Sequence, residues 1–503
     1  MKASLLLFLS LLLSCNLFAE KDVFHEGLQK RLSFIFKDPE LKGMKIGVEV
    51  FSLSRQESLY ETNKEEALSP ASTIKMLTAL VALKRLGPNF TFETQVLYDG
   101  KLNGGVLQGD IYLKGGGDPH LVSERLYLLV QALKRWDLRK ITGNIIVDDS
   151  TFDSIHLDEN RIPTETDRAY NAPVSGLNFN YNTTTVYFRP ADKVGAPPKV
   201  YVDPDTGYID IVNKATTSKR GSAYRLVASR LKDKNGDKII IQGSIPLGIG
   251  EQRTFFNITK PSVYAGRAFK YYLEREGVSV GGNTILQKAT PSDAKSLYSF
   301  RSLPLRDIVI LMNKYSNNFI ADTLVKTLGR EFKSKPGTTD KGLEVIREEA
   351  TRIGINYGPF KVVSGSGLTR INRMSAHQFI QLLNAAYLDF DVLPELLSSF
   401  PIAGKDGTLE KRMKGTEAFG KLRAKTGTID GVSTLVGVVQ SKGGEMLAFS
   451  VLINDPKQRS AAGLKRWENY FGQALASYNR KVILDEKPES LPDVIESKDN
   501  NAR

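Results

Sequence analysis

Hydrophobic and polar positions alternate near both ends of the chain, in the manner of β-strands. One alternating run covers residues 45–51, and a polar turn separates it from a second short strand near Leu59. Toward the other end, residues 432–440 and 446–455 are apolar runs joined by "SKGGE", which predicts a hairpin. We therefore expect one sheet that is assembled from pieces distant in sequence.

Apolar residues recur at helical spacing in several stretches between and after these strands. The helix predicted after residue 72 ends at Gly87-Pro88, and further helical runs cover 305–312 and 319–328. Its apolar face would consist of Ile74, Leu77, Leu80, Val81 and Ala82. Another helix follows the hairpin, with Leu464, Trp467, Phe471 and Leu475 on one side. Separate strands and helices of this kind predict an α+β fold.

The middle of the chain has a different pattern. Short alternating runs, such as residues 180–188, are separated by turns rich in Gly, Asp and Pro. We interpret residues 88–290 as one or two β-rich subdomains inserted into a domain whose two parts are 20–87 and 291–480. Residues 481–503 mix charges and prolines with little apolar periodicity, which is typical of a flexible tail.

The N-terminal stretch "MKASLLLFLSLLLSCNLFAEKD" predicts an export signal covering residues 1–19. It has a basic start, a short apolar run and the small residue Ala19 before the expected cleavage point. The run is too short to cross a bilayer. We therefore expect an exported protein of the periplasm or cell envelope. Alternatively, residues 12–15 resemble a bacterial lipoprotein processing site with an unusual Leu13, and Cys15 would then carry a lipid anchor.

Cys15 is the only cysteine, so the mature protein is expected to contain no disulfide. The formal net charge is +13 and 41% of the residues are apolar, which suits a globular protein with a basic surface. Such a surface favours anionic cell-wall polymers or a loose membrane association, although a generally solvated surface explains it equally well. No dense basic run with aromatics predicts nucleic-acid binding. Four scattered histidines have no metal-ligand spacing, so we expect no metal and no cofactor.

Candidate chemistry begins at Ser72-Thr73-Ile74-Lys75. On a helix, a serine and a lysine three residues apart share one face, and a serine nucleophile needs a neighbouring base. Because an ordinary lysine with a pKa near 10.4 is almost fully protonated at pH 7, a lysine base needs burial or a second cation nearby. The same spacing occurs at Ser229-Lys232 and at Ser292-Lys295, so spacing alone is weak support.

Two further motifs carry residues that suit the same chemistry. In "LRAKTGTIDG", Lys425 offers the second cation and could hold a carboxylate together with Thr426. Gly427 would let a substrate approach an edge strand closely. Ser316 and Asn318 lie between two helical runs, where they could relay a proton and orient a substrate amide or the lysine; a helix N-cap is the simpler role.

The order Ser-x-x-Lys, Ser-x-Asn, Lys-Thr-Gly matches the motif set of penicillin-binding proteins and serine β-lactamases. A rival "SYN" at residues 477–479 follows Lys425 and breaks this order. Together with "GDIYLKGGGDP", "SNNFIADTL", "SGSGL" and "PIAGKDGTLEKRM", the motifs resemble the class C low-molecular-mass penicillin-binding proteins, the D-alanyl-D-alanine carboxypeptidase/endopeptidase family. The resemblance covers most of residues 40–455.

This resemblance implies an antiparallel sheet with helices on both faces, a helical subdomain and a large insertion. It also implies a reaction, in which the penultimate D-alanine of a peptidoglycan stem peptide acylates Ser72 and Lys75 is the general base. The N–H groups of Ser72 and Thr428 would form the oxyanion hole, and Lys425 with Thr426 would bind the terminal carboxylate. β-Lactam antibiotics would be covalent inhibitors.

Ser364 is one departure from the family pattern, because an aspartate is expected at that position. Two other functions remain as alternatives: a serine β-lactamase, and a non-catalytic cell-wall binding protein. Loss of a motif residue would have favoured the binding protein, but Ser72, Lys75, Ser316, Asn318 and Lys425 are all present. The sequence leaves open the oligomeric state and the balance between trimming terminal D-alanine and cutting cross-links.

Overall fold

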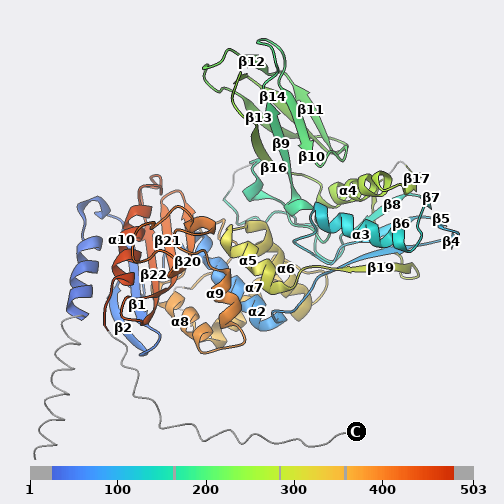
Figure 1. Cartoon of the computed structure of the whole chain (residues 1–503). Helices are drawn as coiled ribbons and strands as arrows, with labels where there is room; N and C mark the ends of the chain where they lie inside the picture. Colours follow the sequence, from blue (N-terminus) through green and yellow to red (C-terminus); the bar gives the residue numbers. More distant parts are fainter. Residues whose placement is uncertain (1–24, 163–165, 283–284, 356–359, 481–503) are drawn as a thin grey trace, which may run out of the picture.

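The computed structural model describes residues 25–162, 166–282, 285–355 and 360–480 (Figure 1). The predicted signal, Cys15 and the predicted tail 481–503 lie outside these ranges. The described chain consists of a sheet with flanking helices, a helical body beside it, and a two-part structure formed by the middle of the sequence. None of the helices in these ranges combines the length and the apolar character that a bilayer crossing requires.

The main sheet joins strands from the two ends of the sequence, as their alternation predicted. Its order is β2-β1-β22-β21-β20 and every neighbouring pair is antiparallel. The strands are β1 (Lys45–Ser52), β2 (Glu57–Thr62), β20 (Leu422–Ile429), β21 (Val432–Gln440) and β22 (Met446–Asn454). Strands β21 and β22 are buried at nearly every position, because helices cover both faces of the sheet.

Helix α10 (Lys465–Ala476) and the helical residues 25–36 pack on one face of this sheet, while α8 (Ala376–Tyr387) packs on the other. Helix α8 also belongs to the helical body. The other helices of this body are α2 (Lys75–Leu86), α5 (Leu305–Lys314), α6 (Asn318–Phe332), α7 (Thr339–Arg352) and α9 (Leu393–Ser399). This arrangement confirms the α+β fold with helices on both faces of an antiparallel sheet.

Helix α2 is the centre of the helical body. The sequence predicted one apolar face, but residues 75–83 are buried on every side. The reason is that α5, α6, α7 and α9 all contact α2, so the polar residues of its first turns are enclosed as well. The predicted apolar face is buried as expected, but the opposite side of the helix is enclosed as well, and Lys75 lies in the protein interior.

The middle of the chain forms two parts. The first has a sheet of order β18-β8-β6-β3-β19 and a small sheet of order β17-β7-β5-β4. The strands of this part are β3 (Glu93–Tyr98), β4 (Lys101–Asn103), β5 (Val106–Gln108), β6 (Ile111–Lys114), β7 (Lys140–Ile141), β8 (Ile145–Asp148), β17 (Ser279–Val280), β18 (Ile285–Gln287) and β19 (Lys295–Arg301).

This part also contains two helices that the β-rich interpretation missed, α3 (Ser123–Arg135) and α4 (Pro261–Arg275). Both share a core with the sheet. The signal for α3 was available in the sequence, because its buried residues Leu126, Leu129, Val130 and Leu133 repeat at helical spacing. Strand β19 pairs with β3, so the sheet of this part includes residues 295–301, which follow the predicted end of the insertion at residue 290.

The second part rises from the first and forms the uppermost lobe in Figure 1. It has sheets of order β10-β9-β16, β11-β14-β13 and β12-β15 around a small core. Its strands are β9 (Thr183–Arg189), β10 (Lys199–Asp203), β11 (Ile209–Asn213), β12 (Thr216–Ser218), β13 (Val227–Lys232), β14 (Asp237–Gln242), β15 (Ser244–Pro246) and β16 (Gln252–Asn257).

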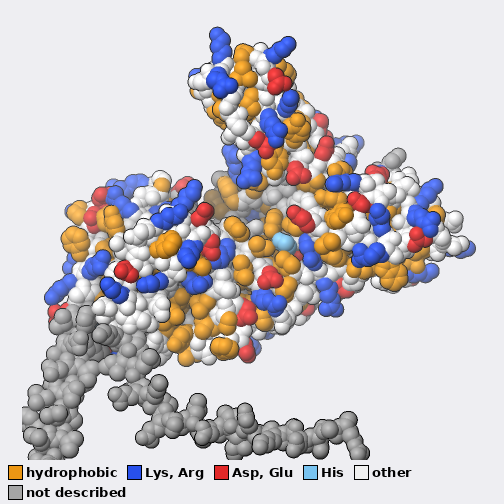
Figure 2. Space-filling model, in the orientation of Figure 1, with side chains coloured by type: hydrophobic (Ala, Val, Ile, Leu, Met, Phe, Trp, Pro, Cys, Tyr) orange, Lys and Arg blue, Asp and Glu red, His pale blue; other side chains and the backbone are white. Residues whose placement is uncertain are grey.

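Figure 2 shows Lys and Arg side chains over the whole visible face of the molecule, interspersed with Asp and Glu.

Candidate active site

Ser72 lies in a tight turn at the start of α2. The turn is the 3-10 segment η2 (Ala71–Ile74), and α2 itself begins only at Lys75. Ala71 has a φ of +45°, a left-handed conformation that costs an ordinary residue roughly 1–2 kcal/mol. Gly367 fixes this turn from outside, since a Cβ on it would lie 2.0 Å from the Ala71 carbonyl oxygen. The strained backbone directly before Ser72 is typical of a functional site.

The amine of Lys75 is the centre of the hydrogen-bond network. Its Nζ donates to Ser72 Oγ at 2.9 Å and to Asn318 Oδ1 at 2.7 Å, and it also donates to the backbone carbonyl of Ser366. The side chain is fully buried. Within the described ranges, no carboxylate forms an ion pair with it. The lysine therefore contacts the serine hydroxyl without a counter-charge in direct contact.

Burial lowers the pKa of Lys75 from its ordinary value to about 7. Two more distant charges act on it in opposite directions, because Asp322 raises the pKa and Arg161 lowers it. These two residues form an ion pair of 2.5 Å with each other. Since the pKa lies near 7, a substantial fraction of Lys75 is neutral at neutral pH and can accept a proton.

The loop between α5 and α6 brings Ser316 and Asn318 to the same place. The N-cap of α6 is Asn317, whose side chain accepts from the N–H of Ile320 at 3.1 Å, so the capping role predicted as an alternative falls on the residue between the two. Ser316 has a φ of +55°, a second strained position beside the site. Asn318 contacts Lys75 through Oδ1 and donates its Nδ2 to the carbonyl of Tyr170 at 3.0 Å.

Lys425 is the second buried lysine of the site. Its Nζ donates to Ser316 Oγ and to the carbonyl of Thr426, both at 2.8 Å. Burial, and after it the positive charge of Lys75, hold the pKa of Lys425 well below its usual range. The motif lies inside β20, which is the edge strand of the main sheet, as the position of Gly427 predicted.

Gly427 brings β20 against the turn that carries Ser72. A Cβ on Gly427 would lie 2.2 Å from Thr434 Oγ1, 2.7 Å from the Pro70 carbonyl oxygen and 3.1 Å from the Ser72 nitrogen. The space that glycine leaves is thus used by the protein's own serine turn. On either side, Thr426 donates to Thr408 Oγ1 at 2.8 Å, and Thr428 is exposed.

All eight predicted site residues therefore lie around one point, while the rival motifs do not. Ser229 and Lys232 are on β13, where residues three apart face opposite sides of the strand. Ser292 precedes β19 in the insertion. Ser477 follows α10 and donates to the Gln473 carbonyl at 2.8 Å.

Three contributors to the site were missed from the sequence: the Ser366 carbonyl, the Tyr170 carbonyl, and the Arg161–Asp322 ion pair. Two of them act through backbone atoms, which no residue type reveals. Arg161 and Tyr170 come from the insertion, so that part of the chain helps to position the site. Only "SGSGL", which contains Ser366, gave a signal, through the family resemblance.

Ser364, the departure from the family pattern, is a buried support of the same loop. Its hydroxyl lies 3.1 Å from Ser366 Oγ and accepts from the N–H of Gly367 at 3.3 Å. Asn372 accepts from the N–H of Ser364 at 3.2 Å and donates to its carbonyl at 2.8 Å. Ser364 thus holds the segment whose carbonyl contacts Lys75.

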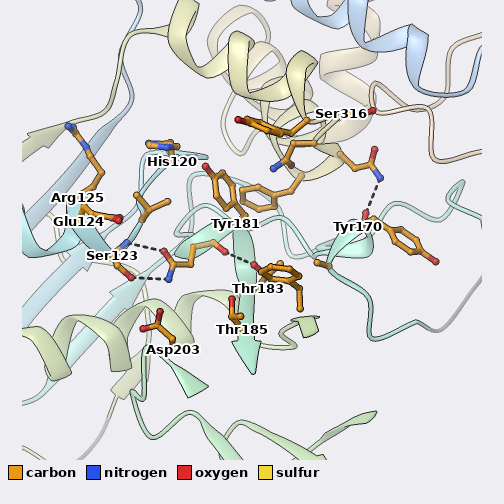
Figure 3. A pocket seen from close by; sticks show the side chains of 18 of the residues that line it. His120, Ser123, Glu124, Arg125, Tyr170, Tyr181, Thr183, Thr185, Asp203 and Ser316 are labelled. Atoms are coloured by element: carbon orange, nitrogen blue, oxygen red, sulfur yellow. Dashed lines mark hydrogen bonds between the residues drawn. The ribbon is translucent and has the colours of Figure 1, made fainter. Parts of the chain in front are cut away.

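A cleft of about 1070 Å³ adjoins the site (Figure 3). The residues of the α5–α6 loop, including Ser316 and Asn318, form one of its walls. Its other walls come from the insertion and include His120, Tyr181 and Asp203. The cleft therefore borders the candidate site through Ser316 and Asn318, whereas Ser72, Lys75 and Lys425 are not among its lining residues.

Comparisons with known proteins show the family to which the chain is similar. The model of the D-Ala-D-Ala carboxypeptidase 3 (S13) family matches residues 28–470. A D-alanyl-D-alanine carboxypeptidase of Actinomadura sp. strain R39 is 34% identical over 440 residues, which cover 85% of this chain and 81% of that protein.

Solved structures of penicillin-binding proteins are also similar to this chain. Penicillin-binding protein 4 (dacB) of Haemophilus influenzae is similar with a TM-score of 0.75 and 25% identity, over 88% of this chain and 99% of that one. Its complex with a β-lactam is similar with a TM-score of 0.70 and 25% identity, over 87% and 97% of the two chains.

Proposed function

Because this chain belongs to the D-Ala-D-Ala carboxypeptidase 3 (S13) family, we propose that Ser72 is the nucleophile with which it hydrolyses D-alanyl-D-alanine in peptidoglycan stem peptides. The protein is a serine DD-peptidase of the low-molecular-mass penicillin-binding type. The assignment of its residues is supported by one observation above all. A fully buried lysine, which has no carboxylate partner among the residues that the structure describes, donates to the hydroxyl of Ser72 at 2.9 Å.

In the acylation step, Ser72 Oγ attacks the carbonyl carbon of the penultimate D-alanine and its proton passes to neutral Lys75. The C–N bond then breaks, the proton goes to the leaving amine, and the terminal residue departs. Water next attacks the ester and hydrolysis returns a proton to Ser72. A positioned base contributes roughly 10²- to 10⁴-fold to such a step.

The neighbouring motif residues would hold the substrate during this reaction. The N–H groups of Ser72 and Thr428 would stabilise the oxyanion, and removal of one such donor typically costs about 10²- to 10³-fold. Lys425 and Thr426 would bind the terminal carboxylate, and that negative charge would favour the protonated form of Lys425. Ser316 lies between Lys425 and the cleft and would return the proton to the leaving amine, while Asn318 orients Lys75.

We further propose that residues 20–87 and the chain from residue 302 to 480 form one catalytic domain, with the intervening residues inserted in it. Export of the protein to the periplasm or cell envelope is proposed from the N-terminal signal. The complex of the Haemophilus influenzae relative with a β-lactam supports binding of the same class of compound by this protein, and we propose that the bound β-lactam acylates Ser72.

Intact mass of the purified protein before and after penicillin, with peptide mapping, tests the assignment of Ser72. We expect one stoichiometric, slowly released adduct on the peptide that contains Ser72. Rapid turnover to penicilloate would identify a serine β-lactamase instead. A folded protein that forms no adduct would favour the non-catalytic cell-wall binding protein.

A further inference from the structure

The cleft beside Ser316 is larger than a single leaving amino acid needs. Its volume of about 1070 Å³ is at the upper end of the range for sites that enclose whole drug-sized ligands. It continues into a second hollow of about 400 Å³, and Asp203 lines both. Together they form one groove, which we call the insertion groove, running from the α5–α6 loop onto the sheet β10-β9-β16.

The register of this sheet explains which side chains line the insertion groove. Thr185 on the central strand β9 is the cross-strand partner of Asp203 on β10 and of Phe255 on β16. Partners in antiparallel strands point to the same face, so these three residues form a row. The next row on that face contains Tyr187 and its partner Tyr201. Strand β9 has seven residues, so this face extends over about 20 Å at roughly 3.4 Å per residue.

Aromatic rings are unusually accessible along this groove. Near the catalytic centre, Tyr315 is 71% exposed and Tyr170 is 51% exposed; farther out, Phe255 is 45% exposed and Tyr201 is 52% exposed. They belong to different elements and all line the two hollows. Hydroxyl and amide groups lie between them, among which Ser123 and Asn180 are hydrogen-bonded to each other (Figure 3).

The charges in the insertion groove bear on whether it binds the glycan strand of peptidoglycan or the stem peptides. Glu124 and Asp203 line the larger hollow, and neither forms an ion pair within the described ranges. Arg125 also lines this hollow; it donates to the carbonyl of Arg301 and lies over the ring of Phe300, but it keeps its positive charge, so these three charges sum to −1. Burial lowers the pKa of His120, so this side chain is neutral at pH 7.

A stem peptide carries carboxylates, which two unpaired acids would repel. A glycan strand has hydroxyl groups that donate to carboxylates and apolar ring faces that lie on aromatic side chains. The second hollow fits the same chemistry. Among its lining residues, Arg189 and Glu251 form an ion pair of 2.6 Å, which leaves the carboxylate of Asp203 to accept from sugar hydroxyls.

We propose that the insertion groove binds the glycan strand of peptidoglycan and so delivers its attached stem peptides to Ser72. This inference rests on the proposed function and deepens it. It assigns to the insertion a saccharide site built from the rows Asp203–Thr185–Phe255 and Tyr201–Tyr187. The enzyme would then prefer peptides that still carry their sugars.

The test compares kcat/KM for a disaccharide pentapeptide with kcat/KM for the same pentapeptide without sugars. For the wild type we expect a ratio of about tenfold or more in favour of the glycosylated substrate. Phe255→Ala and Thr185→Val should each lower this ratio by about fivefold while leaving hydrolysis of the free peptide within about twofold. Tyr224→Ala is the matched control, since Tyr224 is 46% exposed and lies outside the groove.

A second measurement is independent of turnover. Ser72→Ala protein should bind uncharged β-1,4-linked N-acetylglucosamine oligomers, which match the glycan strand without its carboxylates, and Phe255→Ala in that background should weaken this binding. A wild-type ratio near one, or binding of free stem peptides that Phe255→Ala weakens, would overturn the glycan assignment. The proposed function would fail differently, through loss of Ser72-dependent hydrolysis of the free peptide.

Discussion

Two regions around the main sheet bury charged side chains in opposite ways. At the edge strand β20, Lys75 and Lys425 are fully buried, and neither forms an ion pair with a carboxylate in the described part of the chain. At the far side of the sheet, Arg480 is bound to Glu445 at 2.6 Å. Near the opposite end of strand β21, Glu468 on α10 is bound to Arg412 at 2.8 Å and accepts from Ser433.

Burial of a charged side chain has a different effect in each of the two regions. A buried charge is tolerated when a partner of opposite sign and further hydrogen bonds satisfy it, as Ser52 and Arg55 do around Glu445. A buried lysine without such a partner instead loses its proton more easily. The paired region therefore stabilises the fold, whereas the unpaired region produces a base. Helix α6 adds a second paired case, because its buried Lys326 is bound to Asp153.

The largest expected effect is that of Ser72→Ala. This substitution should abolish covalent penicillin labelling and peptide hydrolysis, because no other hydroxyl is within reach of Lys75 Nζ among its described contacts. The melting temperature should remain nearly unchanged, since the side chain is partly exposed and is not part of a core. Mass spectrometry and thermal unfolding check both statements. A labelled variant would remove Ser72 as the nucleophile.

Next in size is Lys75→Arg, which keeps a positive charge but cannot supply a neutral base. We expect the acylation rate to fall by about 10²- to 10⁴-fold. Stopped-flow kinetics with a chromogenic β-lactam measures this rate directly. If Lys75→Arg acylated at the wild-type rate, another group would have to act as the base. Burial of Lys75 without a carboxylate partner would then not explain the reaction.

The paired region should respond in the opposite manner. Glu445→Ala leaves Arg480 buried without its main partner, and such a change typically costs about 3–5 kcal/mol of stability. We expect the lower end of that range, because Arg480 keeps an ion pair of 2.6 Å with Glu57. Urea unfolding measures the loss, and the acylation rate of the folded variant should match the wild type.

Glu65→Ala is the control for that experiment, since Glu65 is exposed and its removal should change stability by no more than about 0.5 kcal/mol. A Glu445→Ala variant that is as stable as wild type would contradict the stabilising role of the paired region. A variant whose acylation also slows would show that the paired region affects catalysis as well.

The sequence predicted the main features of this contrast but not their cause. The strands at both ends followed from their alternation, and the site residues followed from motif order. The burial of α2 on every side could not be predicted, because the packing of α5, α6, α7 and α9 around it is a tertiary property. Without that burial, Ser72-Lys75 has the same spacing as Ser229-Lys232, which lies on a strand.

Ion-pair partners also cannot be predicted from the periodicity of apolar residues. Arg161 and Asp322 are far apart in sequence and meet only because the insertion folds onto α6. The Ser366 carbonyl, which contacts Lys75, is a backbone atom in a loop held by Ser364 and Asn372. Helix α3 is a different case, since its apolar spacing was present and the surrounding strand pattern concealed it.

The smallest expected effect is a pH dependence that belongs to the unpaired region alone. With its pKa at about 7, Lys75 gains its proton as the pH falls below that value, so the acylation rate should drop by up to about tenfold per pH unit and should level off above it. Glu445→Ala should leave this profile unchanged, while a flat profile in the wild type would exclude Lys75 as the base.

The same pKa shift makes a statement about stability, with a definite sign. In the unfolded chain Lys75 has an ordinary lysine pKa, so between about pH 7 and pH 10.5 the unfolded state binds more protons than the folded state. Stability contributed by this group should therefore rise with pH across that window, by up to about 1.4 kcal/mol per unit. Lys75→Met removes the titrating group, so urea unfolding of this variant should show a shallower rise than the wild type. An equal slope in both proteins would mean that Lys75 is charged in the folded state, and burial without a partner would then not explain the base.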